Sequence, residues 1–308
     1  MQKHRYSYEN RGDQVKHRRY IAYIYIAPAV LLVRILLYYP TIANIIYSFH
    51  SFKAYSSNMD FVGLKNYITL FTDDRFYIAL RNNLIFLIFN LVFQVGVALV
   101  LAILVENVAK KRFGRLCRTI YFIPSLFSIT AIAIMWQFIF EPEVGMLNNL
   151  FRALNLDSLV SVKGLLGQES TAIYTVAMMP QWQFTGYFMM LLVVAIQKIP
   201  EDYYDAAEID GASKFRQAIT ITIPMIKEML LVDIVMTVVA TFKSFAEVYQ
   251  LTMGGPGYST LVIGMYAYQN AFKYDRMGYS STIGVIIFLI TFIFSVIQLR
   301  ISNSGGED

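Results

Sequence analysis

The sequence has 308 residues, of which 56% are hydrophobic, 15% aromatic and only 15% charged. Soluble domains carry about 25% charged residues, so this composition, with a mean hydropathy of +0.49, excludes an ordinary water-soluble enzyme and indicates a membrane protein. The single cysteine, Cys117, excludes an internal disulfide and a cysteine-ligated metal cluster. The net charge of +5 could suit a nucleic acid, but the cations follow a membrane pattern, so no nucleic-acid partner is expected.

Six segments are long and apolar enough to cross a bilayer as helices, which takes about 20 residues each. They are 20–48, 84–105, 120–140, 173–196, 230–249 and 283–299. The sequence therefore predicts an all-α integral membrane protein with six transmembrane helices. A cleaved signal peptide is the alternative for the first segment, but its apolar stretch is too long and no small-residue cleavage site follows.

Lys and Arg residues predict the orientation of these spans. Sixteen of them lie in the N-terminal tail, the connections 106–119 and 198–229, and the C-terminal tail, against eight in the other connections. Cytoplasmic connections are the basic ones, so both termini are expected in the cytoplasm. The outer segment 49–83 departs from this rule because it carries Lys53, Lys65, Arg75 and Arg81.

The first three spans contain a few polar or structure-breaking residues. Arg34, in the first span, is expected either to face a partner subunit or to reach the interface. Asn90 and Gln94 in the second span are four residues apart and share one face, which is typical of a helix contact or of a path lining. Pro124 lies in the first turns of the third span, where a missing N–H is tolerated.

The fourth span contains Pro180 and Gly186, which we interpret as a break in the helix. Such a break is acceptable in a membrane only where protein or a water-filled cavity satisfies the backbone. Amides beside aromatic rings are typical of sugar sites, while aromatic rings also anchor helices at the membrane interface. The residues with these two alternative roles are Gln181, Trp182, Gln183 and Tyr187.

The fifth span contains three charged residues. Lys243 and Glu247 are four residues apart, so mutual neutralisation is the favoured interpretation, and a place for Glu247 on a solute path is the alternative. Asp233 lies within a turn of the expected cytoplasmic end and is expected to reach water.

Enzymatic signatures are missing from the sequence. It contains no phosphate-binding G-x-x-x-x-G-K-[ST] segment, no H-E-x-x-H and no G-x-S-x-G. The run Gly254-Gly255-Pro256-Gly257 predicts a turn rather than a cofactor loop. A membrane-embedded enzyme is therefore disfavoured, and no cofactor or metal site is expected on this chain.

The cytoplasmic connection between the fourth and fifth spans predicts two short helices. Pro200 precedes two acids, which favour a helix start because they complement the helix dipole. Asp210-Gly211 predicts a break, and Ser213 can cap a second helix. An apolar stripe is expected on one face, formed by Tyr204, Ala207, Gly211, Phe215 and Ala218. This pattern favours docking of a partner protein in a groove over an interfacial lipid helix, which would carry more cations.

This connection resembles the "EAA" loop in permease subunits of binding-protein-dependent ABC importers. That loop has the pattern E-A-A, three residues, Gly, nine residues, I-x-L-P. The matching positions are Asp205, Ala206, Ala207, Gly211, Ile221, Ile223 and Pro224, with Asp205 in place of Glu and Ile223 in place of Leu. Further segments are similar to the carbohydrate branch of the family: Ala27-Pro28-Ala29, Tyr39-Pro40, residues 61–67, Gln197-Lys198-Ile199-Pro200 and Gly254-Gly255-Pro256.

The resemblance implies a type I importer permease fold in a bacterial or archaeal cell membrane. Residues 1–78 would form the tail, first helix and first outer loop, 79–300 the permease core with its coupling loop at 200–224, and 301–308 a cytoplasmic tail. The expected partners are a second permease, two ATPase subunits that bind ATP and Mg²⁺, and an external sugar-binding protein. A stand-alone ion- or proton-coupled carrier is the alternative, although such carriers often show repeated halves and midplane acids.

Overall fold

The computed structural model describes residues 23–56, 58–108, 112–156 and 163–304, and most of them are helical. Expectations for the first 22 residues and for 305–308 lie outside the described residues. The first half contains η1 (Arg34–Tyr38), α2 (Tyr39–Ser48), β1 (His50–Ser51), β2 (Asp60–Phe61), α3 (Lys65–Phe71), α4 (Asp74–Asn90), η2 (Leu91–Val97), α5 (Ala98–Val108), α6 (Arg112–Phe122), η3 (Ile123–Leu126), α7 (Ile129–Phe140) and α8 (Met146–Ala153). The second half contains α9 (Glu169–Ile196), α10 (Asp202–Ile209), α11 (Lys214–Gln217), η5 (Ala218–Thr222), α12 (Ile223–Met225), α13 (Lys227–Phe242), α14 (Ala246–Leu251), α15 (Ile263–Tyr268), η6 (Gln269–Lys273) and α16 (Met277–Ser304).

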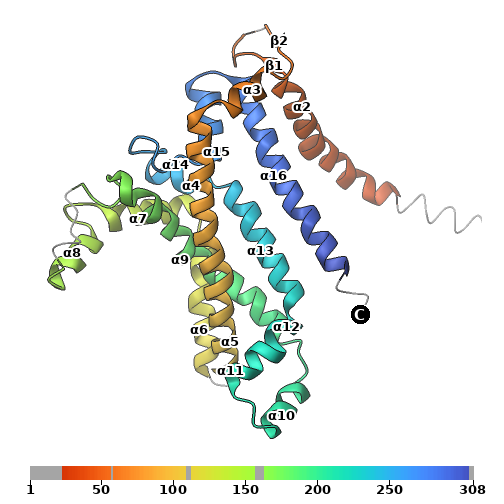
Figure 1. The fold of residues 1–308 in the computed structure, drawn as a ribbon, viewed down its shortest axis with the longest axis vertical. Helices are drawn as coiled ribbons and strands as arrows, with labels where there is room; N and C mark the ends of the chain where they lie inside the picture. Colours follow the sequence, from red (N-terminus) through yellow and green to blue (C-terminus); the bar gives the residue numbers. More distant parts are fainter. Residues whose placement is uncertain (1–22, 57, 109–111, 157–162, 305–308) are drawn as a thin grey trace, which may run out of the picture.

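Among the described residues, four helices are long and apolar enough to cross a membrane. They are Tyr23–Ser48, Asp74–Glu106, Glu169–Ile196 and Met277–Ile301, and they coincide with the first, second, fourth and sixth predicted spans. Figure 1 shows α4 and α5 continuing as one long helix beside α13 and α16, with β1 and β2 at one end of the molecule and α10 at the other. The helix that ends in α2 diverges from this bundle, and Arg34 is exposed on it. The helical membrane fold is confirmed, while six spans and their orientation remain predictions.

The third predicted span is not a straight helix. Its two parts, Gly114–Leu126 and Ile129–Phe140, meet at an angle of 98°, so α7 lies across the bundle. Phe127 and Ser128 have extended backbone conformations between the two parts. An extended link frees backbone groups that a helix would satisfy, and the carbonyl of Phe127 accepts a hydrogen bond from Gln183 Nε2 at 3.0 Å.

The predicted break in the fourth span is wrong. Helix α9 runs without interruption for 28 residues and contains Pro180. Gly186 instead permits close packing of two helices, because a Cβ atom there would lie 1.7 Å from the backbone oxygen of Tyr121 in α6. A glycine in a transmembrane helix is typical of such an approach between backbones.

The fifth predicted span is divided. Helix α13 has 16 residues and ends at Phe242, and α14 begins at Ala246. Asn83 of α4 binds the end of α13 and the start of α15. It donates to the carbonyl of Thr241 (2.9 Å) and accepts from the N–H of Ile263 (2.7 Å). Its amide thus satisfies backbone groups that the ends of helices leave unpaired.

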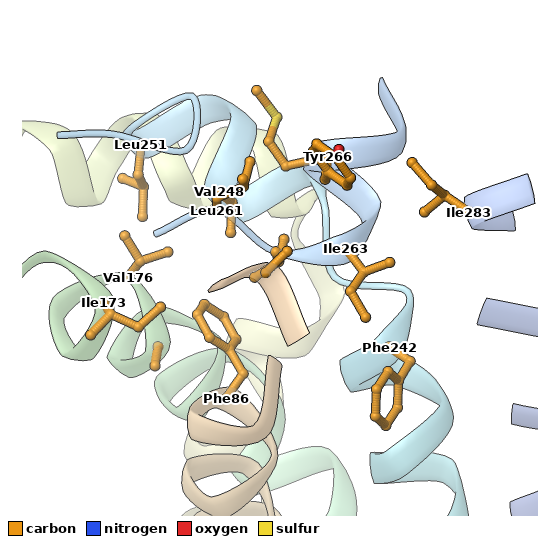
Figure 2. Packing of buried hydrophobic residues seen from close by; sticks show 14 of the residues in the cluster. Phe86, Ile173, Val176, Phe242, Val248, Leu251, Leu261, Ile263, Tyr266 and Ile283 are labelled. Carbon is orange, nitrogen blue, oxygen red and sulfur yellow. The ribbon is translucent and has the colours of Figure 1, made fainter. Parts of the chain in front are cut away.

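The main hydrophobic core lies where α14 and α15 meet the upper parts of α4 and α9 (Figure 2). Phe86 of α4, Val248 of α14 and Ile263 of α15 are at most 2% exposed there. A second cluster joins α5 to the lower part of α9 and includes Ala102 and Leu192. These two clusters hold the short helices of both ends on one frame of long helices.

Candidate functional site

The connection after α9 forms two short helices at one end of the molecule, as the sequence predicts. Helix α10 begins after Pro200, with Asp202 and Asp205 in its first turn. It ends at Ile209, and Gly211 follows with a φ of +74°, a conformation that favours glycine. The Ser213 side chain then accepts from the N–H of Arg216 (3.3 Å) and caps α11.

The apolar residues of this connection point in two directions rather than forming the single stripe that the sequence predicts. Ala218 is buried and Tyr204 half-buried, with the Tyr204 hydroxyl 2.9 Å from Thr222 Oγ1. Phe215 and Ile209 are instead 76% and 87% exposed. The exposed pair is the part available to a partner, and the sequence analysis missed Ile209.

The remaining loop positions singled out in the sequence lie on both helices and after them. Asp205 and Ala206 are exposed on α10, and Ala207 is half-buried beside them. Ile221 and Ile223 are half-buried, whereas Pro224 is exposed where η5 passes into α12. A Cβ atom at Gly211 would meet no atom within 4 Å, so a side chain there would extend from the outer surface of the loop.

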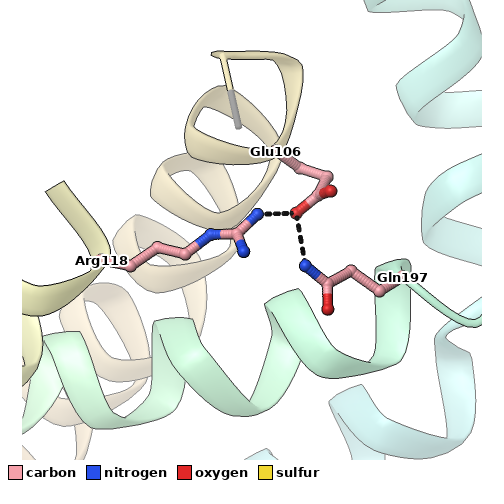
Figure 3. A network of polar contacts seen from close by, with 3 residues as sticks. All are labelled: Glu106, Arg118 and Gln197. Atoms are coloured by element: carbon pink, nitrogen blue, oxygen red, sulfur yellow. Dashed lines mark hydrogen bonds and ion pairs between the residues drawn. The ribbon is translucent and has the colours of Figure 1, made fainter. Parts of the chain in front are cut away.

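A polar contact fixes the point where α9 enters this connection (Figure 3). Arg118 of α6 forms an ion pair with Glu106 of α5, and both groups are largely buried. The Gln197 amide donates to Glu106 at 3.4 Å or, when turned over, accepts from Arg118 Nη1 at 2.9 Å. This contact joins the ends of three helices directly above the loop.

A cavity of about 450 Å³ lies between η2, α9 and the irregular region after α13. Of the five candidate path residues, Tyr187 and Glu247 line it, and Gln181, Trp182 and Gln183 do not. The other polar lining residues are Asn90, Gln94, Ser125, Lys243 and Ser244. Amides, hydroxyls and an aromatic ring around one cavity are suited to a hydroxyl-rich solute.

Gln181 lies behind the wall of this cavity. Its Nε2 atom donates to Asn90 Oδ1 at 2.7 Å, and Gln94 Nε2 lies 3.3 Å from Gln181 Oε1. Asn90 in turn donates to Thr241 Oγ1 at 2.7 Å. Because these side chains bind one another across three helices, Asn90 and Gln94 serve both as a helix contact and as cavity lining.

Gln183 and Trp182 point away from the cavity lining. Gln183 is 2% exposed and binds the bend of the third span, as described above. Trp182 is 47% exposed and meets Trp136 of α7 edge to face, with ring centroids 6.2 Å apart. This geometry places Trp182 beside the crossing helix.

Glu247 and Lys243 do not form the ion pair that the sequence analysis favours. No ion pair between them occurs in the described part of the chain, because α13 ends before Lys243 and the two residues share no helix. Glu247 is 4% exposed at the start of α14. The N-cap of α14 is Phe245, and no side chain caps this helix in the described structure.

Asp233 also differs from expectation, because it is buried rather than in contact with water. It is 0% exposed, and neither carboxylate oxygen has a hydrogen-bond partner among the described residues. The Thr237 hydroxyl, one turn further along α13, is likewise unpaired there. Helix α13 packs against α16, η2, α4 and α9, and Asp233 is enclosed within the bundle although the sequence places it near a helix end.

At the opposite end of the molecule, one carboxylate joins three helices. Asp73 caps α4 through the N–H of Arg75 (2.9 Å) and accepts from the hydroxyls of Tyr266 and Tyr279. Burial alone would raise the pKa of Asp73, but the hydrogen bonds from Tyr266, Arg75 and Tyr279 outweigh it and lower the pKa. Burial and the nearby carboxylate raise the pKa of Tyr266 to about 12.

Comparison with known proteins identifies the family. Residues 98–304 match the model of the "binding-protein-dependent transport system inner membrane component" family. The chain belongs to this family. It is 39% identical to the probable ABC transporter permease protein YurN of Bacillus subtilis over 96% of this chain and all of that protein. It is 30% identical to the arabinooligosaccharides transport system permease protein AraP of Bacillus subtilis, over 92% of this chain and 88% of that protein.

The fold is also that of an ABC importer permease. A chain of a bacterial alginate ABC transporter, solved in complex with an alginate pentasaccharide-bound periplasmic protein, superposes with a TM-score of 0.82. The superposition covers 96% of this chain and 98% of that chain at 22% identity.

The family match includes the connection after α9 and most of the cavity lining, but not the first helix or the lining residues Asn90 and Gln94. It begins at residue 98, near the start of α5, so α2, the β1–β2 hairpin and α4 precede it. The division of the chain at residue 79 stays a prediction.

Proposed function

We propose that this chain is the membrane-spanning permease subunit of an ATP-driven sugar importer and forms half of its translocation path. The observation that carries the proposal is the family match over residues 98–304, which contains the two-helix connection and all the residues that line the cavity except Asn90 and Gln94. A sugar cargo is supported by the name of AraP, a permease for arabinooligosaccharides. The second half of the path belongs to a related permease, and both termini lie in the cytoplasm of a bacterial or archaeal cell.

The loop 200–224 is the contact with a separate ATPase subunit. Asp205, Ala206 and Ala207 lie on the exposed helix α10, beside the exposed side chains of Ile209 and Phe215. Apolar side chains that project from a polar helix pair gain free energy when a partner covers them. ATP and Mg²⁺ bind the partner, and this chain transmits motion without catalysing a reaction.

Cargo passes along the 450 Å³ cavity. Tyr187 offers an aromatic face and Glu247 a carboxylate, and both line the cavity. Gln181 acts indirectly, because it holds Asn90 and Gln94 in the wall. Gln183 and Trp182 set the position of the crossing helix α7, which borders the cavity through Ile129.

Purification and reconstitution test this function. A tagged chain extracted in mild detergent is expected to retain a second permease and an ATPase. In liposomes, the complex is expected to take up a sugar only under two conditions. ATP must be present on the side of the membrane where the ATPase subunits lie, and the solute-binding protein must be present on the opposite side. Uptake by this chain alone, driven by an ion gradient without ATP, would instead establish a stand-alone carrier.

A further inference from the structure

A second polar cavity, of about 610 Å³, lies at the end of the molecule opposite α10. Its walls come from the β1–β2 hairpin, from α3 and from the segment that leads into α16. Figure 1 shows these elements together at the end where β1 and β2 lie. In the predicted orientation this is the outer face of the membrane.

Three cations from separate parts of the sequence line this cavity. They are Lys53, Lys65 and Arg276, all of them exposed. None of the three forms an ion pair within the described residues. The two acids of the cavity are Asp60, which is exposed, and Asp275, whose Oδ1 atom is engaged by the N–H of Ala54 at 2.7 Å. The cavity therefore carries three cations against two acids, a net charge of +1, and the described residues form no ion pair with any of the three cations.

These cations are unusual for their place in the topology. Short outer connections of membrane proteins are normally poor in Lys and Arg, yet the segment 49–83 carries four of these residues. Arg75 has a partner inside the molecule, since its guanidinium lies 5.0 Å from the ring centroid of Tyr258. Lys53 and Lys65 instead face the cavity, where Arg276 joins them from the other connection.

The frame that carries the cations is held firmly. Asn66 Nδ2 donates to the carbonyls of Ser48 and His50, both at 2.9 Å. The N–H of Met277 donates to the carbonyl of Phe52 at 3.2 Å, and a Cβ atom at Gly278 would lie 1.8 Å from the oxygen of His50. Because the two connections are tied together, a partner that binds here does not have to order the backbone, which lowers the entropic cost of binding.

We propose that this cavity receives an acidic surface of the external solute-binding protein. This rests on the proposed function, in which an external solute-binding protein delivers the cargo. Carboxylate side chains on a folded partner would pair with Lys53, Lys65 and Arg276, which form no ion pair with the part of the chain that the structure describes. Complementary charge at an interface raises the rate of encounter and fixes the register of docking. The cavity shares no lining residue with the intramembrane cavity, so the two act separately.

The test uses the complete importer in liposomes and the solute-binding protein that activates it. The variant Lys53→Glu/Lys65→Glu is compared with wild type and with Arg81→Glu, which changes a cation of the same segment outside the cavity. ATP hydrolysis is measured against the concentration of the binding protein. We expect the double variant to need about tenfold more binding protein for half-maximal activation, with basal hydrolysis unchanged. Arg81→Glu should behave as wild type.

Added salt provides a second measurement. Higher ionic strength should weaken activation of wild type more than that of the double variant, since exposed charges are screened. Equal requirements in wild type and the double variant, or an equal loss in Arg81→Glu, would overturn the proposal. The proposal would also be overturned if the difference between wild type and the double variant disappeared in liposomes of neutral phosphatidylcholine. That result would assign the cations to lipid headgroups. Lys53→Gln/Lys65→Gln, a milder change, should show a smaller loss and guards against misfolding. If wild type is not activated by any solute-binding protein, the proposed function itself fails.

Discussion

Replacing Gln183 by methionine distinguishes a residue that holds the bend of the third span from one that touches cargo. Gln183 is 2% exposed, and its Nε2 atom donates to the carbonyl of Phe127 at 3.0 Å. Methionine keeps the length of the side chain but removes the donor, so this carbonyl loses a partner at a cost of about 1–3 kcal/mol. The Gln183 Oε1 atom has no hydrogen-bond partner among the described residues, and its removal offsets part of this cost. We expect a net destabilisation of about 1–2 kcal/mol.

Two assays on the purified and reconstituted complex measure the outcome. Thermal unfolding in detergent should show the loss of stability. Uptake of two sugars of different length should fall by the same factor, because the bend affects α7 rather than one subsite. Tyr187→Leu is the comparison, since Tyr187 lines the cavity. It should change the ratio of the two sugars.

The reasoning would be refuted by the opposite pattern. If Gln183→Met left the unfolding temperature unchanged and altered the preference between the two sugars, Gln183 would contact cargo directly. The bend would then depend on other contacts, and the carbonyl of Phe127 would have another partner in the working complex.

Three further predictions follow from the loop and from the outer end. Gly211→Arg should leave the complex assembled but abolish activation of ATP hydrolysis by the binding protein. Gly211→Asn should retain most of this activation, because asparagine tolerates a positive φ. Full activity of the arginine variant would exclude docking at this surface. Because the pKa of Asp73 is lowered, its contribution to stability is present above its ordinary pKa and is lost as the pH falls through the lowered value. Asp73→Asn should therefore unfold at a lower temperature than wild type at pH 7. A difference in unfolding temperature that persisted undiminished into the acid range would refute this. A cysteine at Asn58 should react with an impermeant thiol reagent outside whole cells and one at Ser213 should not, and the reverse result would invert the topology.

Local patterns in the sequence were sufficient to predict the two short helices of the loop after α9. A proline before acids, a glycine after them and a serine before the next helix each act within a few residues of the chain. Helix α10, the positive φ of Gly211 and the Ser213 cap all follow from such signals. The exposure of Ile209 depends on where α11 packs, and no local pattern contains that information.

The errors share a different cause, which is dependence on neighbouring helices. Pro180 and Gly186 indicate a break when α9 is considered alone, but α9 tolerates the proline inside the bundle and uses the glycine for contact with Tyr121. The bend at Phe127 has little signal of its own because its freed carbonyl is satisfied by a residue 56 positions away. Asp233 is buried by α13 packing that hydropathy does not record.

The contact at Gly186 couples two parts of the molecule mechanically. Helices α6 and α9 approach backbone to backbone there, Arg118 of α6 contacts Gln197 after α9, and Gln183 of α9 binds the carbonyl of Phe127 in the link that follows α6 and η3. We expect these three contacts to prevent sliding or rotation of one segment against the other. A displacement of the loop at the end of α9 would therefore move α6 and α9 together as one rigid body. Because α7 is attached at the opposite end of this rigid body, such a displacement would move α7 beside the cavity.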